Sequence, residues 1–193
     1  MKKKLIITFN SPVILGFVFI CFIVTLLGII SGGRITELLF MTYRASFKDP
    51  LTYVRFFTHI LGHSDWSHFI GNASYLLLLG PMLEEKYGSK TLLQIMAFTA
   101  IVTAIFHFIF FPEAALCGAS GVVFAFIVLA SFTGFREGEI PLTFILVVII
   151  FIGQQIFEGI TVRDDISNTG HIIGGAVGAL IGYVLNKKTK DNN

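Results

Sequence analysis

Charged side chains are scarce in this sequence of 193 residues. Asp, Glu, Lys and Arg make up 13% of it, about half the share in a typical soluble domain, whereas hydrophobic residues make up 54%. The mean hydropathy is +0.81. Such a composition excludes an ordinary water-soluble domain and indicates a membrane protein. The net charge of +2 is too small to indicate a surface that binds nucleic acid.

Cysteine is also scarce, with two residues in the chain. Cys21 and Cys117 are too few for a disulfide framework, and Cys21 lies within an apolar run. The H-E-x-x-H pattern is absent, and no cysteine or carboxylate stands at a convincing ligand spacing from the pair His59 and His63, which we interpret as structural. We therefore expect no metal and no other cofactor. The sequence also lacks the internal repeat that a small transporter would usually show.

Long apolar runs make up most of the chain. Six runs of about 15 to 22 residues are candidates to cross the hydrocarbon core as helices. They cover residues 12–30, 68–83, 91–111, 120–135, 142–157 and 171–185, and residues 31–67 are expected to form an outer loop. The sequence thus predicts an all-α membrane protein, with six transmembrane helices bundled in a single domain over residues 1–193.

Lysines cluster at both ends of the chain. Lys2, Lys3 and Lys4 precede the first run, and Lys187, Lys188 and Lys190 follow the last. An even number of spans places both termini on one side, and the positive-inside tendency makes that side the cytoplasm. The first run is too long for a signal-peptide core and has no clear cleavage site, so we expect it to be retained. Runs two, four and six then cross from outside to inside.

Three polar residues stand at the same distance from the charged inner ends of these parallel runs. His68 precedes Glu84, Ser120 precedes Arg136 and His171 precedes Lys187, each by sixteen positions. Sixteen helical residues rise about 24 Å, against a hydrocarbon core of about 30 Å. We therefore expect a serine and two histidines at one level below the outer surface, where a hydrolytic site could be built.

Ser120 lies in the segment Cys117–Gly121, at the start of the fourth run. Its G-x-S-G string is not the G-x-S-x-G elbow of α/β hydrolases, and alone it is equally typical of small residues that let helices pack closely in lipid. A proline and a glycine, Pro112 and Gly118, predict irregular backbone ahead of the serine. Irregular backbone at membrane depth is tolerated only where it is buried in protein or lines a watery cavity. This context favours Ser120 as a nucleophile.

His171 is the candidate general base, because a neutral imidazole can take a proton from a serine near pH 7. Gly174 and Gly178 fall on the face of His171 and would let a neighbouring helix, which we take to be the fourth run, approach closely. The alternative is a histidine hydrogen-bonded within glycine-rich packing. Asp164 and Asp165 precede His171, and we expect them to be solvated in an outer loop rather than to complete a triad.

His68 and Asn72 stand four positions apart, so both point from one helix face. Both side chains can donate hydrogen bonds to a developing oxyanion, and each such donor is worth a few kcal/mol in a transition state. The alternative is a pair of interhelical polar contacts without a catalytic role.

Taken together, these residues resemble the rhomboid family of intramembrane serine proteases, over essentially all six runs. The matching positions are Arg55–His59 with His63, His68 and Asn72, then Glu84 with Gly88 and Ser89, then Gly118–Gly121, and His171 with Gly174 and Gly178. The resemblance implies a dyad of Ser120 and His171. It implies an oxyanion hole formed by His68, Asn72 and the backbone amide of Ser120. The supporting residues are Gly118, Gly121, Phe124, Gly174 and Gly178.

The chain departs from the family pattern at two positions. Phe124 stands where the family often has a tyrosine that stacks on the catalytic histidine, so the stacking is retained and a hydroxyl is lost. Val54 precedes Arg55 where the family has a tryptophan. Neither change removes a catalytic atom, so we still expect activity.

The resemblance implies a multi-pass protein of the plasma membrane whose active site opens to the extracytoplasmic side. Its expected partners are the lipid bilayer and single-pass or other transmembrane substrates, which it would cleave near the outer face. No metal, cofactor or nucleic acid is expected. The alternative is a catalytically silent rhomboid-like protein that binds transmembrane segments, although such a protein would be expected to lack the nucleophile or the base.

Overall fold

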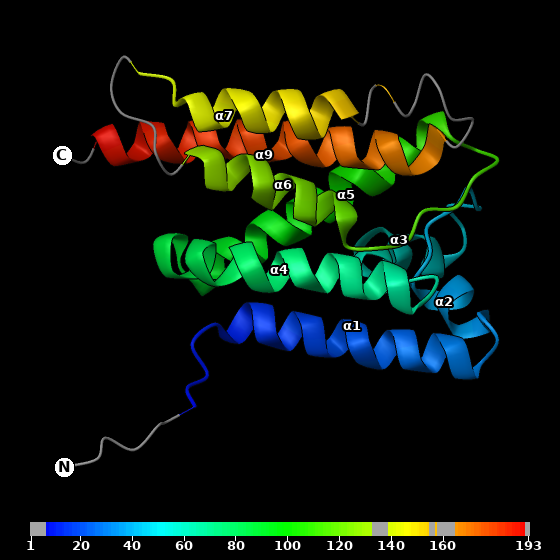
Figure 1. Ribbon diagram of the computed structural model, residues 1–193. Coiled ribbons are helices and arrows are strands. Elements are labelled where there is room, and N and C mark those ends of the chain that lie inside the picture. Colours follow the sequence, from blue (N-terminus) through cyan, green and yellow to red (C-terminus); the bar gives the residue numbers. More distant parts are fainter. Residues whose placement is uncertain (1–6, 133–138, 155–156, 158–164, 192–193) are drawn as a thin grey trace, which may run out of the picture.

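The chain forms a bundle of helices. The computed structural model describes residues 7–132, 139–154, 157 and 165–191. The main helices are α1 (Pro12–Ile30), α4 (Trp66–Tyr87), α5 (Ser89–Phe110), α6 (Ser120–Ser131) and α9 (Asp165–Asp191), while α7 (Leu142–Val147) continues into a π-helical turn, η3 (Val148–Ile152). Helix α1 lies at one edge of the bundle and α7 at the opposite edge (Figure 1). The described residues contain no β-strand, so the predicted all-α class is confirmed for them.

The observed helices follow the predicted apolar runs closely, but their ends differ. Helix α1 has the predicted bounds, whereas α4 and α9 extend beyond theirs at both ends. Helix α6 is described as far as Ser131, and Arg136 lies outside the described residues. Among those residues, α1 and α5 are long and apolar enough by themselves to cross a membrane. Shorter apolar helices occur in α6, in α7 with η3, and in α9.

The predicted outer loop contains two short helices that the sequence reasoning missed. These are α2 (Arg34–Leu39) and α3 (Pro50–Thr58), and a 3₁₀ turn, η1 (His59–Leu61), follows α3. Asp49 caps α3, its side chain accepting a hydrogen bond of 3.0 Å from the amide of Leu51. An aspartate followed by a proline is a typical helix start, so this signal was present in the sequence.

Arg55 holds the outer segment together. It is 3% exposed, its Nε donates to the carbonyl of Leu38 at 2.9 Å, and its Nη1 lies 3.3 Å from Asp49 Oδ2. Its guanidinium also lies 4.6 Å from the ring centroid of Tyr43, so Arg55 has an aromatic neighbour. Val54, which stands where the family has a tryptophan, is 42% exposed. A charged group buried as deeply as Arg55 is tolerated because two of its nitrogens are hydrogen-bonded and one of these partners is a carboxylate.

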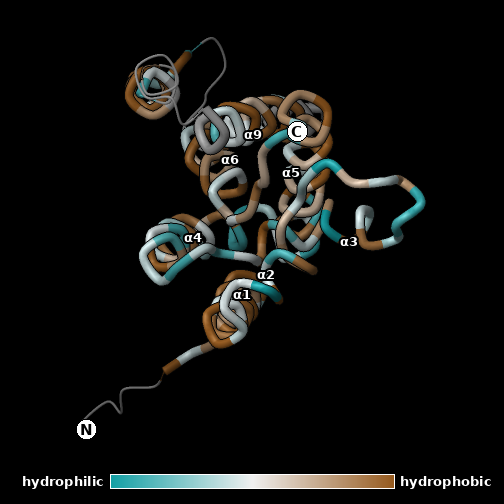
Figure 2. Tube along the Cα trace, turned by 90° about the vertical axis from the view of Figure 1, so that its right-hand side faces the viewer, coloured by the Kyte–Doolittle hydropathy of each residue, from teal (hydrophilic) through white to brown (hydrophobic). Residues whose placement is uncertain are grey.

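Helix α6 occupies the middle of the bundle, among α4, α5 and α9 (Figure 2). It packs most closely against α9, at positions where both helices carry glycine or alanine. A Cβ added at Gly174 would clash with the carbonyl of Gly121, and one added at Gly178 would clash with the carbonyl of Ala125. Glycine at these two positions therefore allows the backbones of α6 and α9 to touch, as small residues do in membrane bundles.

Candidate active site

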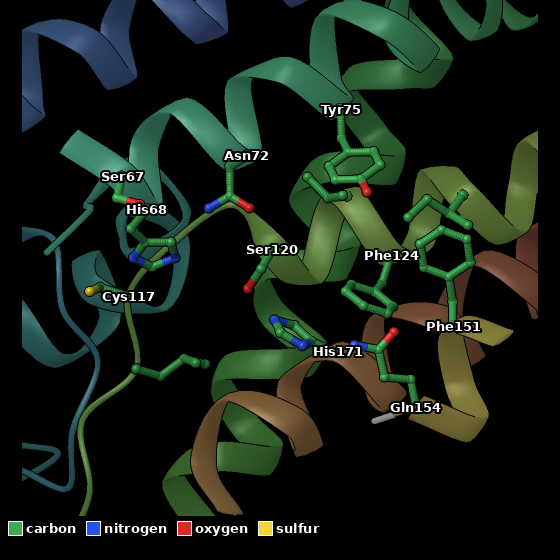
Figure 3. A pocket seen from close by; sticks show the side chains of 14 residues that line it. Ser67, His68, Asn72, Tyr75, Cys117, Ser120, Phe124, Phe151, Gln154 and His171 are labelled. Atoms are coloured by element: carbon green, nitrogen blue, oxygen red, sulfur yellow. The ribbon is translucent and has the colours of Figure 1, made fainter. Parts of the chain in front are cut away.

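A cavity of about 460 Å³ opens between α4, α6, η3 and α9 (Figure 3). Its polar lining includes His68, Asn72, Cys117, Ser120, Gln154 and His171. The rest of the wall is largely apolar, with Val123, Phe124, Ile127 and Phe151. The two residues of the expected dyad and the two expected oxyanion donors thus face one space, although they come from three helices.

Ser120 is the first residue of α6, and the segment before it is irregular, as the sequence indicated. Gly118 has φ +118°, a left-handed conformation that favours glycine, and a Cβ there would stand only 2.6 Å from His68 Nε2. The Gly118 amide donates to the carbonyl of His59 at 2.9 Å. Leu116 and Thr42 exchange two backbone hydrogen bonds of 2.9 and 2.8 Å. The segment leading to the serine is therefore fixed to the outer segment.

His171 lies on α9 opposite the serine. Its ring stacks on Phe124, with the ring centroids 4.3 Å apart and the planes within 6° of parallel. Phe124 follows Ser120 by one helical turn, and the side chains of Ser120 and His171 point toward one another (Figure 3). The close approach of Gly121 to Gly174 brings the two helices together at this level. The imidazole is thus held in a defined plane beside the serine.

His68 and Asn72 approach the serine from α4. The position that a Gly118 Cβ would take is 2.6 Å from His68 Nε2 and 3.6 Å from Asn72 Nδ2, so both nitrogens converge on the backbone just before Ser120. Asn72 is 7% exposed, and its Nδ2 is buried without a hydrogen-bond acceptor in the described part of the chain. An unsatisfied buried donor costs about 1–3 kcal/mol. Such a donor is typical of a site built to receive an acceptor.

Two further histidines lie behind this group. His59 Nδ1 is 3.2 Å from the carbonyl of Arg55, and its Nε2 is 3.4 Å from Thr103 Oγ1. His63 packs edge-on against the His68 ring, with a centroid distance of 5.0 Å. Burial lowers the pKa of each to about 4, so both rings are neutral near pH 7. No group of three or more His, Cys, Asp or Glu side chains arranged as for a metal occurs among the described residues.

The cavity also contains residues that the sequence reasoning did not assign to a site. Tyr75 follows Asn72 by three positions on α4, and this helical spacing could have identified it. Phe151 and Gln154 come from η3 and the helical residues after it, and no motif marks them because their direction depends on how that segment packs. Burial, and then the charge of Asp65, raises the pKa of Cys117 to about 11, so its thiol stays protonated.

Asp164 and Asp165 were expected in an outer loop, and for Asp165 this prediction is wrong because it belongs to a helix. Asp164 lies outside the described residues, and Asp165 begins α9. The cavity is lined by no carboxylate from the described part of the chain.

Comparison with known proteins identifies the family. The rhomboid domain matches residues 50–188, which is most of the chain. Rhomboid protease GlpG of Haemophilus influenzae is 22% identical over 173 residues, covering 80% of this chain and 88% of that protein. Rhomboid-related protein 2 of Mus musculus is 28% identical over 159 residues, covering 72% of this chain and 52% of that protein.

A plant protein gives a similar match. The chloroplastic rhomboid-like protein 11 of Arabidopsis thaliana is 22% identical over 147 residues, covering 69% of this chain and 52% of that protein. The chain therefore spans about half the length of the mouse and plant relatives and most of the bacterial one. The family match includes every residue that lines the cavity. The chain belongs to the rhomboid family of integral membrane proteins.

Proposed function

We propose that this protein is an intramembrane serine endopeptidase that cleaves transmembrane-helix substrates near the outer face of the membrane. The observation that carries the proposal is the convergence of Ser120, His171, His68 and Asn72 on one cavity. A nucleophile, a base and oxyanion donors around one space are the parts that acyl transfer requires.

In the proposed mechanism, Ser120 Oγ attacks a peptide carbonyl while His171 takes its proton. The carbonyl oxygen becomes an oxyanion that accepts hydrogen bonds from Asn72, His68 and the Ser120 amide. His171 then gives the proton to the leaving amine, and water in the cavity hydrolyses the acyl-enzyme with the same base. No metal or cofactor takes part in these steps.

Two observations support the proposed roles of Asn72 and His171. The Asn72 amide nitrogen is buried without an acceptor among the described residues, which suits a donor whose partner forms only during the reaction. Phe124 stacks on His171 and fixes the plane of its ring. Phe124 lacks the hydroxyl of the tyrosine often found there in the family, so the stacking has to position the base without a hydrogen bond.

We further propose that residues 1–193 form one rhomboid domain with six transmembrane helices, both termini in the cytoplasm and the cavity open to the extracytoplasmic side of the plasma membrane. The aligned helices support this arrangement (Figure 1). Large apolar side chains exposed around the bundle support it too, among them Leu78 at 72%, Leu142 at 68% and Ile149 at 62%. Such a surface is stable against lipid and not against water.

The proposed substrates are transmembrane segments of other proteins. A helix presents no free carbonyl to a nucleophile because its backbone groups are bonded to one another. Substrates with small or helix-breaking residues near the outer surface should therefore be cleaved preferentially, since they unwind at lower cost.

A silent binding protein is the second candidate, and one observation favours it. A second cavity of about 440 Å³ lies between α4, α6 and α7 and shares Tyr75, Ile127 and Phe151 with the first. Its wall is mostly apolar, so it could hold part of a transmembrane segment without any chemistry. The two candidates differ in whether Ser120 is activated.

Covalent labelling tests this difference directly. The purified protein in detergent is treated with a fluorophosphonate probe, as wild type, Ser120→Ala, His171→Ala and Ser74→Ala. Ser74 is the matched control, because it is exposed on α4 and lines neither cavity. Within the described part of the chain its hydroxyl bonds only to the Ile70 carbonyl, at 2.8 Å. We expect labelling in wild type and Ser74→Ala and none in the other two. A folded wild type that takes no label would favour the binding protein.

A further inference from the structure

Ser64 and Asp65, just before α4, form a hydrogen-bonded chain with His68 in its first turn. Ser64 Oγ donates to Asp65 Oδ2 at 2.7 Å and lies 3.3 Å from His68 Nδ1. Asp65 Oδ1 accepts from the backbone amide of His68 at 2.9 Å, so the same carboxylate also caps α4. Ser64 is thereby fixed between a carboxylate and the imidazole that faces the proposed oxyanion.

The positions of the hydrogens in the Ser64–Asp65–His68 hydrogen bonds determine which nitrogen of His68 can donate. Ser64 has one hydroxyl hydrogen, and the short bond to the charged carboxylate uses it. Ser64 Oγ can then only accept from His68, so Nδ1 carries a hydrogen. In a neutral ring Nε2 is consequently an acceptor, although Nε2 is the nitrogen that faces Gly118 beside the serine. His68 can donate to an oxyanion only if its ring takes a second proton.

We propose that Ser64 and Asp65 are positioning residues that stabilise His68 as an imidazolium while the oxyanion forms at Ser120. This inference rests on the proposed function and adds a role for two residues outside the dyad. As negative charge develops on the substrate oxygen, the ring lies between that oxygen at Nε2 and the Ser64–Asp65 pair at Nδ1. Nε2 takes one proton from water, both ring nitrogens then donate, and the proton returns to water when the intermediate collapses.

This arrangement stabilises the transition state more than the resting enzyme. The second anion that favours the charged ring is present only while the oxyanion exists, so the interaction is strongest where catalysis needs it. Asp65 is ready for this role, because hydrogen bonds from the His68 amide and then from Ser64 lower its carboxyl pKa and keep it ionised.

Besides Asp65, three titratable side chains lie near His68, and two of them do not change charge near pH 7. His63 packs against its ring, Cys117 lies on the segment before α6, and His171 faces it across the cavity. Burial holds the pKa of His63 at about 4 and that of Cys117 at about 11, so neither changes charge near pH 7. The reaction as proposed needs a neutral His171 and a protonated His68, so both residues shape the pH–rate profile. The limb that moves when Ser64 or Asp65 is substituted is the one that reports His68.

Kinetics of two variants test the proposal. Asp65→Asn removes the charge but keeps a side-chain oxygen that caps the helix, and Ser64→Ala removes the link. For cleavage of a transmembrane substrate in proteoliposomes, we expect each to lower kcat about fivefold with KM unchanged, a modest effect because both residues are exposed. One limb of the pH–rate profile, the one set by His68, should move to lower pH, and the other limb should stay in place. Ser74→Ala is the control and should match wild type.

A double-mutant cycle separates this role from helix capping. Asp65→Asn should have no further effect in a His68→Ala background, because the relay acts only through that ring. An equal loss in both backgrounds, or no loss in either, would overturn the proposal.

Nitrogen-15 NMR of the five histidines gives a test that needs no activity. The His68 signals are identified by their absence in His68→Gln. Wild type should show the hydrogen of neutral His68 on Nδ1, and Ser64→Ala should shift it toward Nε2. A wild-type ring protonated on Nε2 would refute the relay. If Ser120 takes no fluorophosphonate label, the proposed function fails, whereas this measurement still decides the relay.

Discussion

Eight of the twelve residues of α6 are buried, whereas α7 buries none. Both helices are built mainly from Val, Ile, Leu and Phe, so their hydropathy does not explain the difference. Helix α6 carries small residues four positions apart, Gly121 and Ala125, which meet Gly174 and Gly178 of α9. Small residues let backbones touch, and in lipid this packing, rather than apolarity, decides which helix lies inside.

The same difference divides the walls of the candidate site. Ser120 and His171 stand on the tightly packed pair α6 and α9, whereas Phe151 and Gln154 stand on the peripheral segment that follows α7. Reacting groups need positions fixed to a fraction of an ångström, which packed helices provide. A wall that only contacts substrate tolerates looser packing.

Loss of a core side chain should show the largest contrast between the two helices. Phe126 of α6 is 0% exposed, whereas Ile149 of η3 is 62% exposed. We expect Phe126→Ala to lower the free energy of unfolding by about 3 kcal/mol, because a cavity forms, and Ile149→Ala to change it by less than about 0.5 kcal/mol. Reversible unfolding in mixed micelles measures both. Similar losses at the two positions would contradict the assignment of α7 and η3 to the periphery.

Larger side chains should also destabilise the α6–α9 contact more than the peripheral segment. Leucine at Gly178 would push into the backbone of Ala125, whereas a Cβ at Gly153 meets nothing within 4 Å. We expect Gly178→Leu to destabilise the fold by about 2 kcal/mol, and Gly153→Leu to leave it unchanged or raise its stability by up to about 1 kcal/mol through helix propensity. The same unfolding assay applies. A tolerated leucine at Gly178 would show that the α6–α9 contact can yield.

The ring of Phe124 contacts both the tightly packed helix α9 and the peripheral segment η3. It stacks on His171 of α9 at 4.3 Å and meets Phe151 of η3 edge-on at 6.2 Å. We expect Phe124→Ala to lower kcat about tenfold, because the base loses its stacking partner, and Phe124→Tyr to retain activity. Phe151→Ala should lower kcat about twofold at most. Initial rates of substrate cleavage decide, and a larger effect at Phe151 would assign the positioning role to the peripheral wall.

The sequence predicted the family and the all-α class, because apolar runs and a set of spaced polar residues are written directly into it. The bounds of α1 also follow from composition alone. It did not predict the burial of α6 or the exposure of α7, since hydropathy is the same for a lipid-facing helix and a core helix. Tyr75 and Gln154 were missed for a related reason: their place in the cavity depends on which helices meet.

Helix α1 differs from α7 in having a polar anchor, and this anchor gives the smallest predicted effect. Glu84 accepts hydrogen bonds from the hydroxyls of Ser11 and Ser89 and from the amides of Val13 and Ile14. Burial raises the carboxyl pKa of Glu84, but these four hydrogen bonds outweigh it and leave the pKa below its usual 4.5. A carboxyl with a depressed pKa stabilises the fold above about pH 4.5, and this contribution is lost as the pH falls through the lower, folded-state value.

Glu84→Gln should therefore remove part of the pH dependence of stability below about pH 4.5. We expect a loss of about 1 kcal/mol at pH 7 that stays constant down to about pH 4.5 and shrinks below it, because the amide keeps one acceptor but lacks the charge. Unfolding in micelles at several pH values measures it, with Glu37→Gln on α2 as the control. A loss that stays constant below about pH 4.5 as well would mean that the charge of the carboxylate adds nothing to the hydrogen bonds that anchor α1.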